Sequence, residues 1–237
     1  DGLLVELHKE EHDNNFSVGD IYLGKVRKTV PGLNASFVNV GYEKDGFLHY
    51  LDLGPQFNSL NKFTKQAIGE KLNTASLKNF KKETTLNKDG IINDALKGGD
   101  LVLTQISKEP ISTKGPRLTT EISIAGRFIV LIPKSKYIGV SKKMRDKFER
   151  RRLKKIAHEI KQPGLGMILR TVAEGKSNLQ IENDYKALIK KYNTLQSKSE
   201  KFKAPKLIHD DLKVTSSVLR DLISEKVEKI VVDSKED

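Results

Sequence analysis

Two phenylalanines and two lysines are the residues whose types could most directly carry a binding function. Phe37 stands in Ala-Ser-Phe-Val-Asn-Val and Phe47 in Gly-Phe-Leu-His, on neighbouring predicted strands, while Lys25 and Lys114 supply positive charge. Bases stack on flat aromatic side chains and phosphates bind to cations, so this combination predicts a surface for single-stranded nucleic acid. The alternative is that both rings belong to the hydrophobic core, because an alternating strand can bury either face.

A second set of residues could bind a terminal phosphate. Arg170 and Thr171 follow the Gly-rich turn 163–166, at the end of a short predicted strand, 167–171. The planar guanidinium group of Arg170 matches a phosphate, and the hydroxyl and backbone N–H of Thr171 can complete the shell. The alternative is that Arg170 closes the strand end through a surface salt bridge.

The carboxylates late in the chain do not predict a metal site, because their spacing forms no Asp or Glu cluster. We therefore assign neither a catalytic role nor a metal to any of them: Asp210, Asp211, Asp221 and Asp233. The chain has no Cys, which excludes a disulfide scaffold, a thiolate zinc site and cysteine catalysis in these 237 residues.

The charge balance favours a polyanionic partner. The 43 Lys and Arg against 31 Asp and Glu give a formal net charge of +12. Residues 142–161 hold ten basic and three acidic side chains, and so seven of those twelve charges. Their apolar positions recur every three to five residues and predict an amphipathic helix with a basic outer face: Met144, Phe148, Leu153, Ile156 and Ile160.

A membrane is the less favoured partner of this basic helix, since it has no Trp and no wide apolar face. The longest near-apolar stretch, 128–133, is far shorter than the roughly 20 residues that span a bilayer. The start of the chain shows no signal-peptide pattern. We expect a cytoplasmic protein.

Short strands punctuated by Gly and Pro dominate the first half of the chain. Segments 21–30, 35–40, 46–50 and 100–106, with strand character again over 117–132, predict five antiparallel strands of an OB-type barrel. Residues 54–99 interrupt them, and we expect a mobile insertion with some helix over 61–72, because few of its residues could hold it against a core. We further predict helices over 180–197 and 216–223 and a terminal strand over 230–232.

Four segments resemble the ribonuclease E/G family, and the resemblance covers nearly the whole chain apart from 54–99. They are GDIYLGKVRKTVPGLNASFVNVGYEKDGFLHYLDLG, ISKEPISTKGPRLTTEISIAGRFIVLIP, IGVSKKM and PGLGMILRTVAEG. The resemblance implies that Phe37, Phe47 and Lys114 contact RNA. It also implies that Arg170 and Thr171 hold the 5′-monophosphate of the substrate.

The resemblance completes this 5′-phosphate pocket with three further positions. It implies that backbone around Gly126 and Val130 shapes the pocket and that a basic residue in the GVS motif assists. Lys142 stands where the family usually has Arg, which keeps the charge but loses the bidentate geometry. The alternative for Lys142 is a solvated lysine at the start of a helix.

The implied architecture is mixed α+β, with an OB-fold barrel and a 5′-sensor subdomain inserted in an incomplete ribonuclease-H-like scaffold. Residues 1–18 and 205–237 resemble the two parts of that scaffold, 19–124 the OB domain and 125–204 the 5′ sensor. The chain begins with Asp1 rather than Met, and we expect that an upstream part, including the first scaffold strand, has been removed or is not included. The family's cleavage centre, where two aspartates hold Mg²⁺, and its zinc-binding Cys pair would lie beyond Asp237, so we expect no cofactor in this segment.

The leading hypothesis is the single-stranded-RNA-binding, 5′-monophosphate-sensing part of an endoribonuclease of rRNA processing and mRNA decay. The parent would be Mg²⁺-dependent and this segment inactive, with any homo-oligomer confined to the full-length protein. A non-catalytic RNA-binding adaptor of ribosomes or translation is the alternative, and a DNA-binding OB protein is a third.

Overall fold

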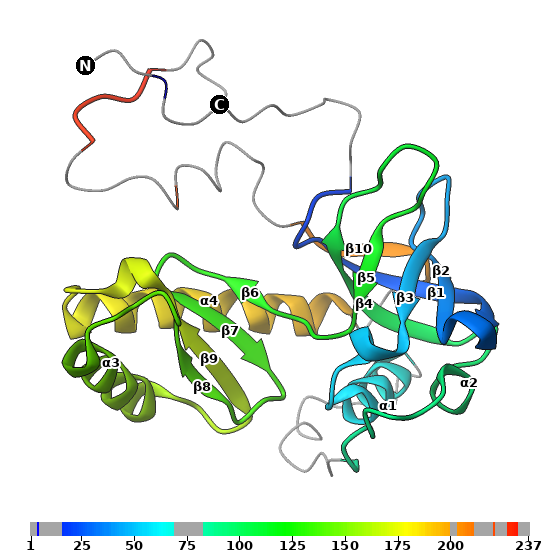
Figure 1. Ribbon diagram of the computed structural model, residues 1–237, viewed down its shortest axis with the longest axis horizontal. Helices are drawn as coiled ribbons and strands as arrows, with labels where there is room; N and C mark the ends of the chain where they lie inside the picture. The colour runs from blue at the N-terminus through cyan, green and yellow to red at the C-terminus, as the bar shows by residue number, and fades with distance from the viewer. Residues whose placement is uncertain are drawn as a thin grey trace.

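The computed structural model describes residues 4, 16–68, 83–199, 203–210, 220 and 227–231. Figure 1 shows a β-barrel beside a smaller β-sheet that carries two helices. Residues 1–10, apart from Leu4, and the predicted helix over 216–223, apart from Arg220, lie outside the described residues. The predicted strand over 230–232 is wrong at Ile230 and Val231, which have no regular secondary structure.

Five strands close the barrel. Each strand pairs with the next in the order β1-β2-β3-β5-β4, and β4 pairs back with β1. The strands are β1 (Ile21–Val30), β2 (Ala35–Asn39), β3 (Gly46–His49), β4 (Leu101–Lys108) and β5 (Arg117–Thr119). This closed five-stranded barrel is consistent with the predicted OB fold, and β10 (Lys206–His209) adds to its edge beside β1.

Alternation along β2 and β3 decides which side chains face inward. Val38 and Leu48 are fully buried in the barrel core, so Phe37 and Phe47, one residue away, lie on the outer face. The 3₁₀ helix η1 (Pro31–Leu33) connects β1 to β2, and Asn34 ends it with φ 46°. Asparagine is one of the few side chains that adopt this conformation at low cost.

The segment between β3 and β4 packs against the barrel, contrary to expectation. It follows η2 (Tyr50–Leu53) and contains α1 (Phe57–Ile68) and α2 (Ile92–Ala95). Phe57, Ile92 and Leu96 are at most 2% exposed and join the barrel core. The prediction that few residues of 54–99 could hold it against a core is therefore wrong for its described part, whereas residues 69–82 are outside the description.

The second unit is a four-stranded sheet in the order β6-β7-β9-β8. Its strands are β6 (Ile124–Ala125), β7 (Ile129–Pro133), β8 (Ile138–Val140) and β9 (Leu165–Leu169). Two helices pack on one face of it, α3 (Lys147–Ile160) and α4 (Asn178–Ser199), and the 3₁₀ helix η4 (Thr171–Ala173) follows β9 (Figure 1). Leu153 of α3 and Ile181 of α4 are buried with Leu131 and Met167 of the sheet, which fixes both helices on that face.

Candidate nucleic-acid interface

The two predicted aromatic residues meet on the outside of the barrel. Phe37 on β2 and Phe47 on β3 are directly opposite in register, with ring centroids 5.9 Å apart and ring planes at 70°. Both rings are partly exposed, and the His49 ring lies 6.4 Å from that of Phe47. The core alternative is thus wrong, and the rings form a solvent-facing aromatic pair on which bases could stack.

Cations extend this aromatic pair to both sides. Lys28 is opposite Phe37 in register, and its Nζ lies 5.3 Å from the centroid of that ring. On the other side Arg117 is in register with Phe47, and Lys108 is in register with Arg117. We call the row Lys28, Phe37, Phe47, Arg117 and Lys108 the barrel platform. Since residues in register point to one face, it presents two rings between three cations.

Sequence reasoning missed the three cations of the barrel platform, because their place depends on the pairing register and on a β-bulge between Val26 and Lys28. Arg117 also forms an ion pair with Asp52, with Nη2 3.0 Å from Oδ2. That pair orients the guanidinium group beside Phe47.

Of the two lysines predicted from sequence, Lys114 belongs to a loop that touches this platform, whereas Lys25 is further along β1. Lys25 is exposed and opposite Asn39. Lys114 lies in the β4–β5 loop, two residues before Pro116, whose carbonyl accepts a hydrogen bond from the Phe47 N–H at 2.8 Å. Gly115 lets the β4–β5 loop approach the β2–β3 loop closely, since a Cβ at Gly115 would lie 2.2 Å from the Asp45 carbonyl oxygen.

The predicted phosphate ligand Arg170 is held at the end of β9 by backbone groups. Its Nη1 donates to the Gly126 carbonyl at 2.9 Å and to the Arg127 carbonyl at 3.4 Å. Its backbone N–H donates to the Phe128 carbonyl at 2.8 Å. Arg170 and Gly126, 44 residues apart in the sequence, are thus neighbours, and the guanidinium group is oriented by carbonyl oxygens.

Asp184 of α4 fixes the loop that orients Arg170. Its carboxylate accepts hydrogen bonds from three consecutive backbone N–H groups, those of Arg127, Phe128 and Ile129, at 3.1, 2.8 and 3.0 Å. A Cβ at Gly126 would lie 2.7 Å from an Asp184 carboxylate oxygen, so only glycine fits there. Sequence reasoning missed Asp184, since nothing in the polar helix pattern distinguishes it.

The Thr171 hydroxyl pairs with a residue of the GVS motif. Thr171 Oγ1 lies 2.9 Å from Ser141 Oγ, and the Ser141 backbone N–H donates to the Leu169 carbonyl at 2.9 Å. Lys142 follows Ser141 directly and is exposed. The structure therefore places Arg170, Thr171, Gly126 and Lys142 around one end of the four-stranded sheet.

Comparison with known proteins identifies the family of this chain. The model of the Ribonuclease E/G family matches residues 123–237. The chain is 37% identical to ribonuclease E of a Nostoc species over 93% of its length, and 31% identical to ribonuclease G of Escherichia coli strain K12 over 99% of its length. This chain belongs to the ribonuclease E/G family. It spans 28% of that ribonuclease E and 44% of that ribonuclease G.

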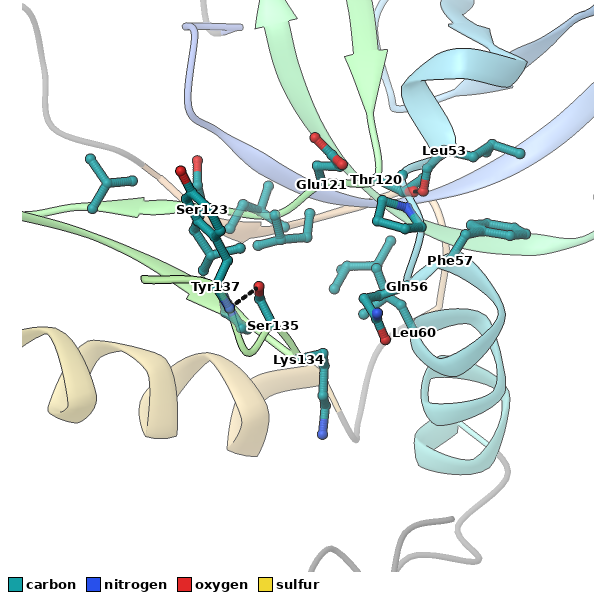
Figure 2. Close-up of a pocket in the computed structure, with 18 of the residues that line it drawn as sticks. Leu53, Gln56, Phe57, Leu60, Thr120, Glu121, Ser123, Lys134, Ser135 and Tyr137 are labelled. Atoms are coloured by element: carbon teal, nitrogen blue, oxygen red, sulfur yellow. Dashed lines mark hydrogen bonds between the residues drawn. The ribbon is translucent and has the colours of Figure 1, made fainter. Parts of the chain in front are cut away.

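Within this ribonuclease E/G chain, the prediction for Val130 concerned its backbone, and its side chain faces away from Arg170. Ile129 and Leu131 are buried on the helix-covered face of β7, so the Val130 side chain points to the opposite face. It lines an apolar cavity of about 540 Å³ between the sheet and the barrel, which Leu60, Tyr137 and Ile168 also line (Figure 2). Only the backbone of Val130, paired with Ala125 beside Gly126, remains next to the Arg170 loop.

The described residues of this ribonuclease E/G chain include no cluster of metal-ligating side chains. No group of three His, Cys, Asp or Glu side chains among them lies close enough to hold an ion. The helices in the described part of the chain are also too short or too polar to cross a membrane.

Removal of either platform ring should weaken binding to every single strand. We expect Phe37→Ala or Phe47→Ala to cost about 1–3 kcal/mol in RNA binding, because each ring supplies a stacking surface. Fluorescence anisotropy with a labelled RNA measures the loss. The control is Leu51→Ala, which removes an exposed apolar side chain outside the platform and should leave affinity unchanged. Leu48→Ala does not serve as a control, because Leu48 is buried in the barrel core. Full affinity in both Phe variants would show that the barrel platform does not bind RNA.

Glu149 of α3 should give the protein an acid-sensitive contribution to stability. Hydrogen bonds from Arg152, at 2.6 and 2.7 Å, hold the pKa of the Glu149 carboxyl below its ordinary value, and the Gly175 N–H adds to this effect. The contribution of the ionised carboxylate to stability is therefore fully present above the unfolded-state pKa, about 4.3. It is lost as the pH falls through the lower folded-state pKa.

We therefore expect Glu149→Gln to lower the free energy of unfolding by about 1–2 kcal/mol at neutral pH, with the difference shrinking below about pH 4. Urea unfolding of both proteins across that range measures it. The exposed Glu159→Gln on the same helix is the control and should change stability by less than about 0.5 kcal/mol. A difference that is constant with pH would contradict the role of the ionised carboxylate.

Proposed function

We propose that this chain is the RNA-binding and 5′-monophosphate-sensing part of an endoribonuclease that acts on single-stranded RNA in rRNA processing and mRNA decay. The observation that carries the proposal is the barrel platform, where Phe37 and Phe47 stand between cations in register. Rings bind bases of any sequence and cations bind the backbone, which suits a substrate track rather than a sequence reader. The names of the relatives, ribonucleases E and G, support RNA as the substrate class.

The 5′ end of the RNA would bind at the Arg170 group. Carbonyl oxygens hold the guanidinium group in one orientation, and a fixed fork recognises phosphate more specifically than a flexible ammonium. Thr171 would add its hydroxyl and backbone N–H, and Lys142 a long-range charge. An RNA-binding adaptor that retained only the barrel would leave this second group unexplained.

Cleavage would take place in a part of the parent protein that this chain does not contain. The chain spans less than half of the curated relatives it matches, and the resemblance assigns the Mg²⁺-binding aspartates and the zinc-binding Cys pair to the remainder. We assign no catalytic residue here. We also propose that the protein is cytoplasmic. Any self-association would occur only in the full-length protein and not in this segment.

The test is to incubate the purified chain with a 3′-labelled single-stranded RNA and Mg²⁺, and to follow binding and cleavage in the same samples. We expect a retarded complex and intact RNA. A matched DNA strand competes for the same platform and shows whether the 2′-hydroxyl contributes. Mg²⁺-dependent cleavage that co-purifies with the chain, or failure of the chain to bind RNA, would overturn the proposal that this chain binds RNA and another part of the protein cleaves it.

A further inference from the structure

We propose that α3 carries a second single-stranded-RNA contact, which binds the nucleotides next to the 5′ end. The contact is a stripe of exposed residues that we call the α3 stripe: Lys147, Phe148, Arg151, Lys154 and Lys155. It rests on the proposed function, since it needs the 5′ phosphate to be held at Arg170. It adds a base-stacking residue outside the barrel.

Phe148 is the residue that the sequence pattern misplaces. Apolar spacing assigns it to the buried face of the helix, yet its exposure is 81%, the largest among the exposed large hydrophobic side chains of the described residues. At 100° per residue, Phe148 is about 140° from Leu153, which is fully buried. It projects into solvent on the basic side, and an exposed phenyl ring among cations is the arrangement on which bases stack.

The cations of the α3 stripe differ in their surroundings from the other arginines of the helix. Arg150 donates to the carbonyls of Ser141 and Met144, and Arg152 is bound to Glu149. These two arginines therefore stabilise the fold through hydrogen bonds and an ion pair. Lys147, Arg151, Lys154 and Lys155 lie within about 100° of helix surface, over a length of about 12 Å.

Acidic side chains of α3 and its cap do little to neutralise this stripe. Asp146 caps the helix by accepting from the Phe148 N–H at 2.8 Å, and Glu149 is engaged by Arg152. The exposed Glu159 is at i+4 from Lys155, but the two form no ion pair in the described structure, so it offsets charge only at the far end of the stripe. The charge therefore fits a polyanion. A single apolar residue is too little for insertion into a lipid surface, which favours RNA over an anionic membrane.

The start of α3 is fastened to the proposed 5′-phosphate site. Arg150 binds the Ser141 carbonyl, and the Ser141 hydroxyl is 2.9 Å from that of Thr171. Lys142 and Lys143, both exposed, lie between this contact and the helix. In this proposal a strand whose 5′ phosphate is bound at Arg170 would pass these lysines and the start of α3 to reach Phe148, which lies about 160° around the helix from Arg150.

A tryptophan reporter tests the contact directly, because the chain contains no Trp. Phe148→Trp supplies the sole indole, and we expect its fluorescence to be quenched when 5′-phosphorylated decauridylate stacks on it. Ile91→Trp, at a position 53% exposed on the barrel side, is the matched control and should respond little. No quenching at position 148 by RNA that is shown to be bound would overturn the proposal.

Affinity then separates stacking and charge from generic effects. We expect Phe148→Ala to weaken decauridylate binding roughly 5- to 100-fold but to leave binding of uridine 5′-monophosphate unchanged, because a single nucleotide held at Arg170 has no neighbour to stack on Phe148. Lys154→Ala/Lys155→Ala should weaken the decamer more than Lys190→Ala/Lys191→Ala, which removes the same charge from exposed positions on α4. Equal effects of the two lysine pairs, or stronger binding to anionic phospholipid vesicles than to RNA, would contradict the proposal.

These outcomes remain distinct from failure of the proposed function. If Arg170→Ala abolishes the preference for a 5′ phosphate while Phe148→Ala changes nothing, the sensor stands and the α3 stripe is wrong. If no 5′ preference exists but Phe148→Trp is quenched, α3 binds RNA independently and the connection to the 5′ end is wrong.

Discussion

Arg170→Ala should abolish discrimination between RNA 5′ ends. We expect the wild-type chain to bind a 5′-monophosphorylated strand about 10- to 100-fold more tightly than the 5′-hydroxyl strand, and the variant to bind both equally, because a hydrogen-bonded charge pair contributes roughly 1.5–3 kcal/mol. Hydrogen bonds to the Gly126 and Arg127 carbonyls orient the guanidinium group of Arg170, so a phosphate bound to it would lie at a defined place. Anisotropy titrations with the two strands measure both affinities.

Arg170→Lys is the matched control, since it keeps the charge and removes the fork. We expect it to retain a small part of the discrimination. Binding of the 5′-hydroxyl strand should hardly change in either variant, because in our proposal the barrel platform holds the body of the RNA. An equal loss of affinity for both strands in Arg170→Ala would make Arg170 a general phosphate contact and not a sensor.

Asp184→Ala should have the largest combined effect on stability and on end recognition. The substitution leaves three consecutive backbone N–H groups of the Arg127–Ile129 loop without their carboxylate acceptor. We expect the free energy of unfolding to fall by about 2–4 kcal/mol, since bonds to a charged acceptor contribute more than neutral ones. The loop that orients Arg170 is released at the same time, so 5′-end discrimination should also be lost.

Urea unfolding measures the stability change, and the two-strand titration measures the change in recognition at a temperature where the variant is folded. Asp184→Asn retains one acceptor oxygen and should be intermediate in both. Glu182→Gln removes a neighbouring carboxylate whose only described ion pair is the exposed one with Lys186, and should have little effect. Normal discrimination in folded Asp184→Ala would show that the loop does not position Arg170.

Local patterns predict the strands of the barrel well. The first predicted strand, 21–30, coincides with β1, and the alternation around Phe37 and Phe47 determines their common face. The barrel platform was only half predicted, because Lys28 and Arg117 join the rings through the bulge and through parallel pairing of β3 with β5. Register of that kind is a tertiary property that composition does not encode.

The sequence did not predict correctly which apolar side chains are buried in segments with few apolar residues. In the described part of 54–99, Phe57, Ile92 and Leu96 are buried in the barrel core, and Asn34 and Tyr50 bond to the backbone of the segment. At Phe148 the opposite error occurs, since helical spacing cannot tell a core residue from an exposed one at the first turn. Asp184 shows the third limit, because its partners lie more than 50 residues earlier in the chain.

The most direct test of the central claim is the affinity of the unmodified chain for one short single-stranded RNA with either a 5′-monophosphate or a 5′-hydroxyl. The salt concentration must be held near physiological, since non-specific phosphate binding changes steeply with it. Tighter binding of the monophosphate is the predicted result and would place a working 5′ sensor in this chain. Equal binding of both strands would contradict it and leave a basic barrel that binds RNA without reading its end.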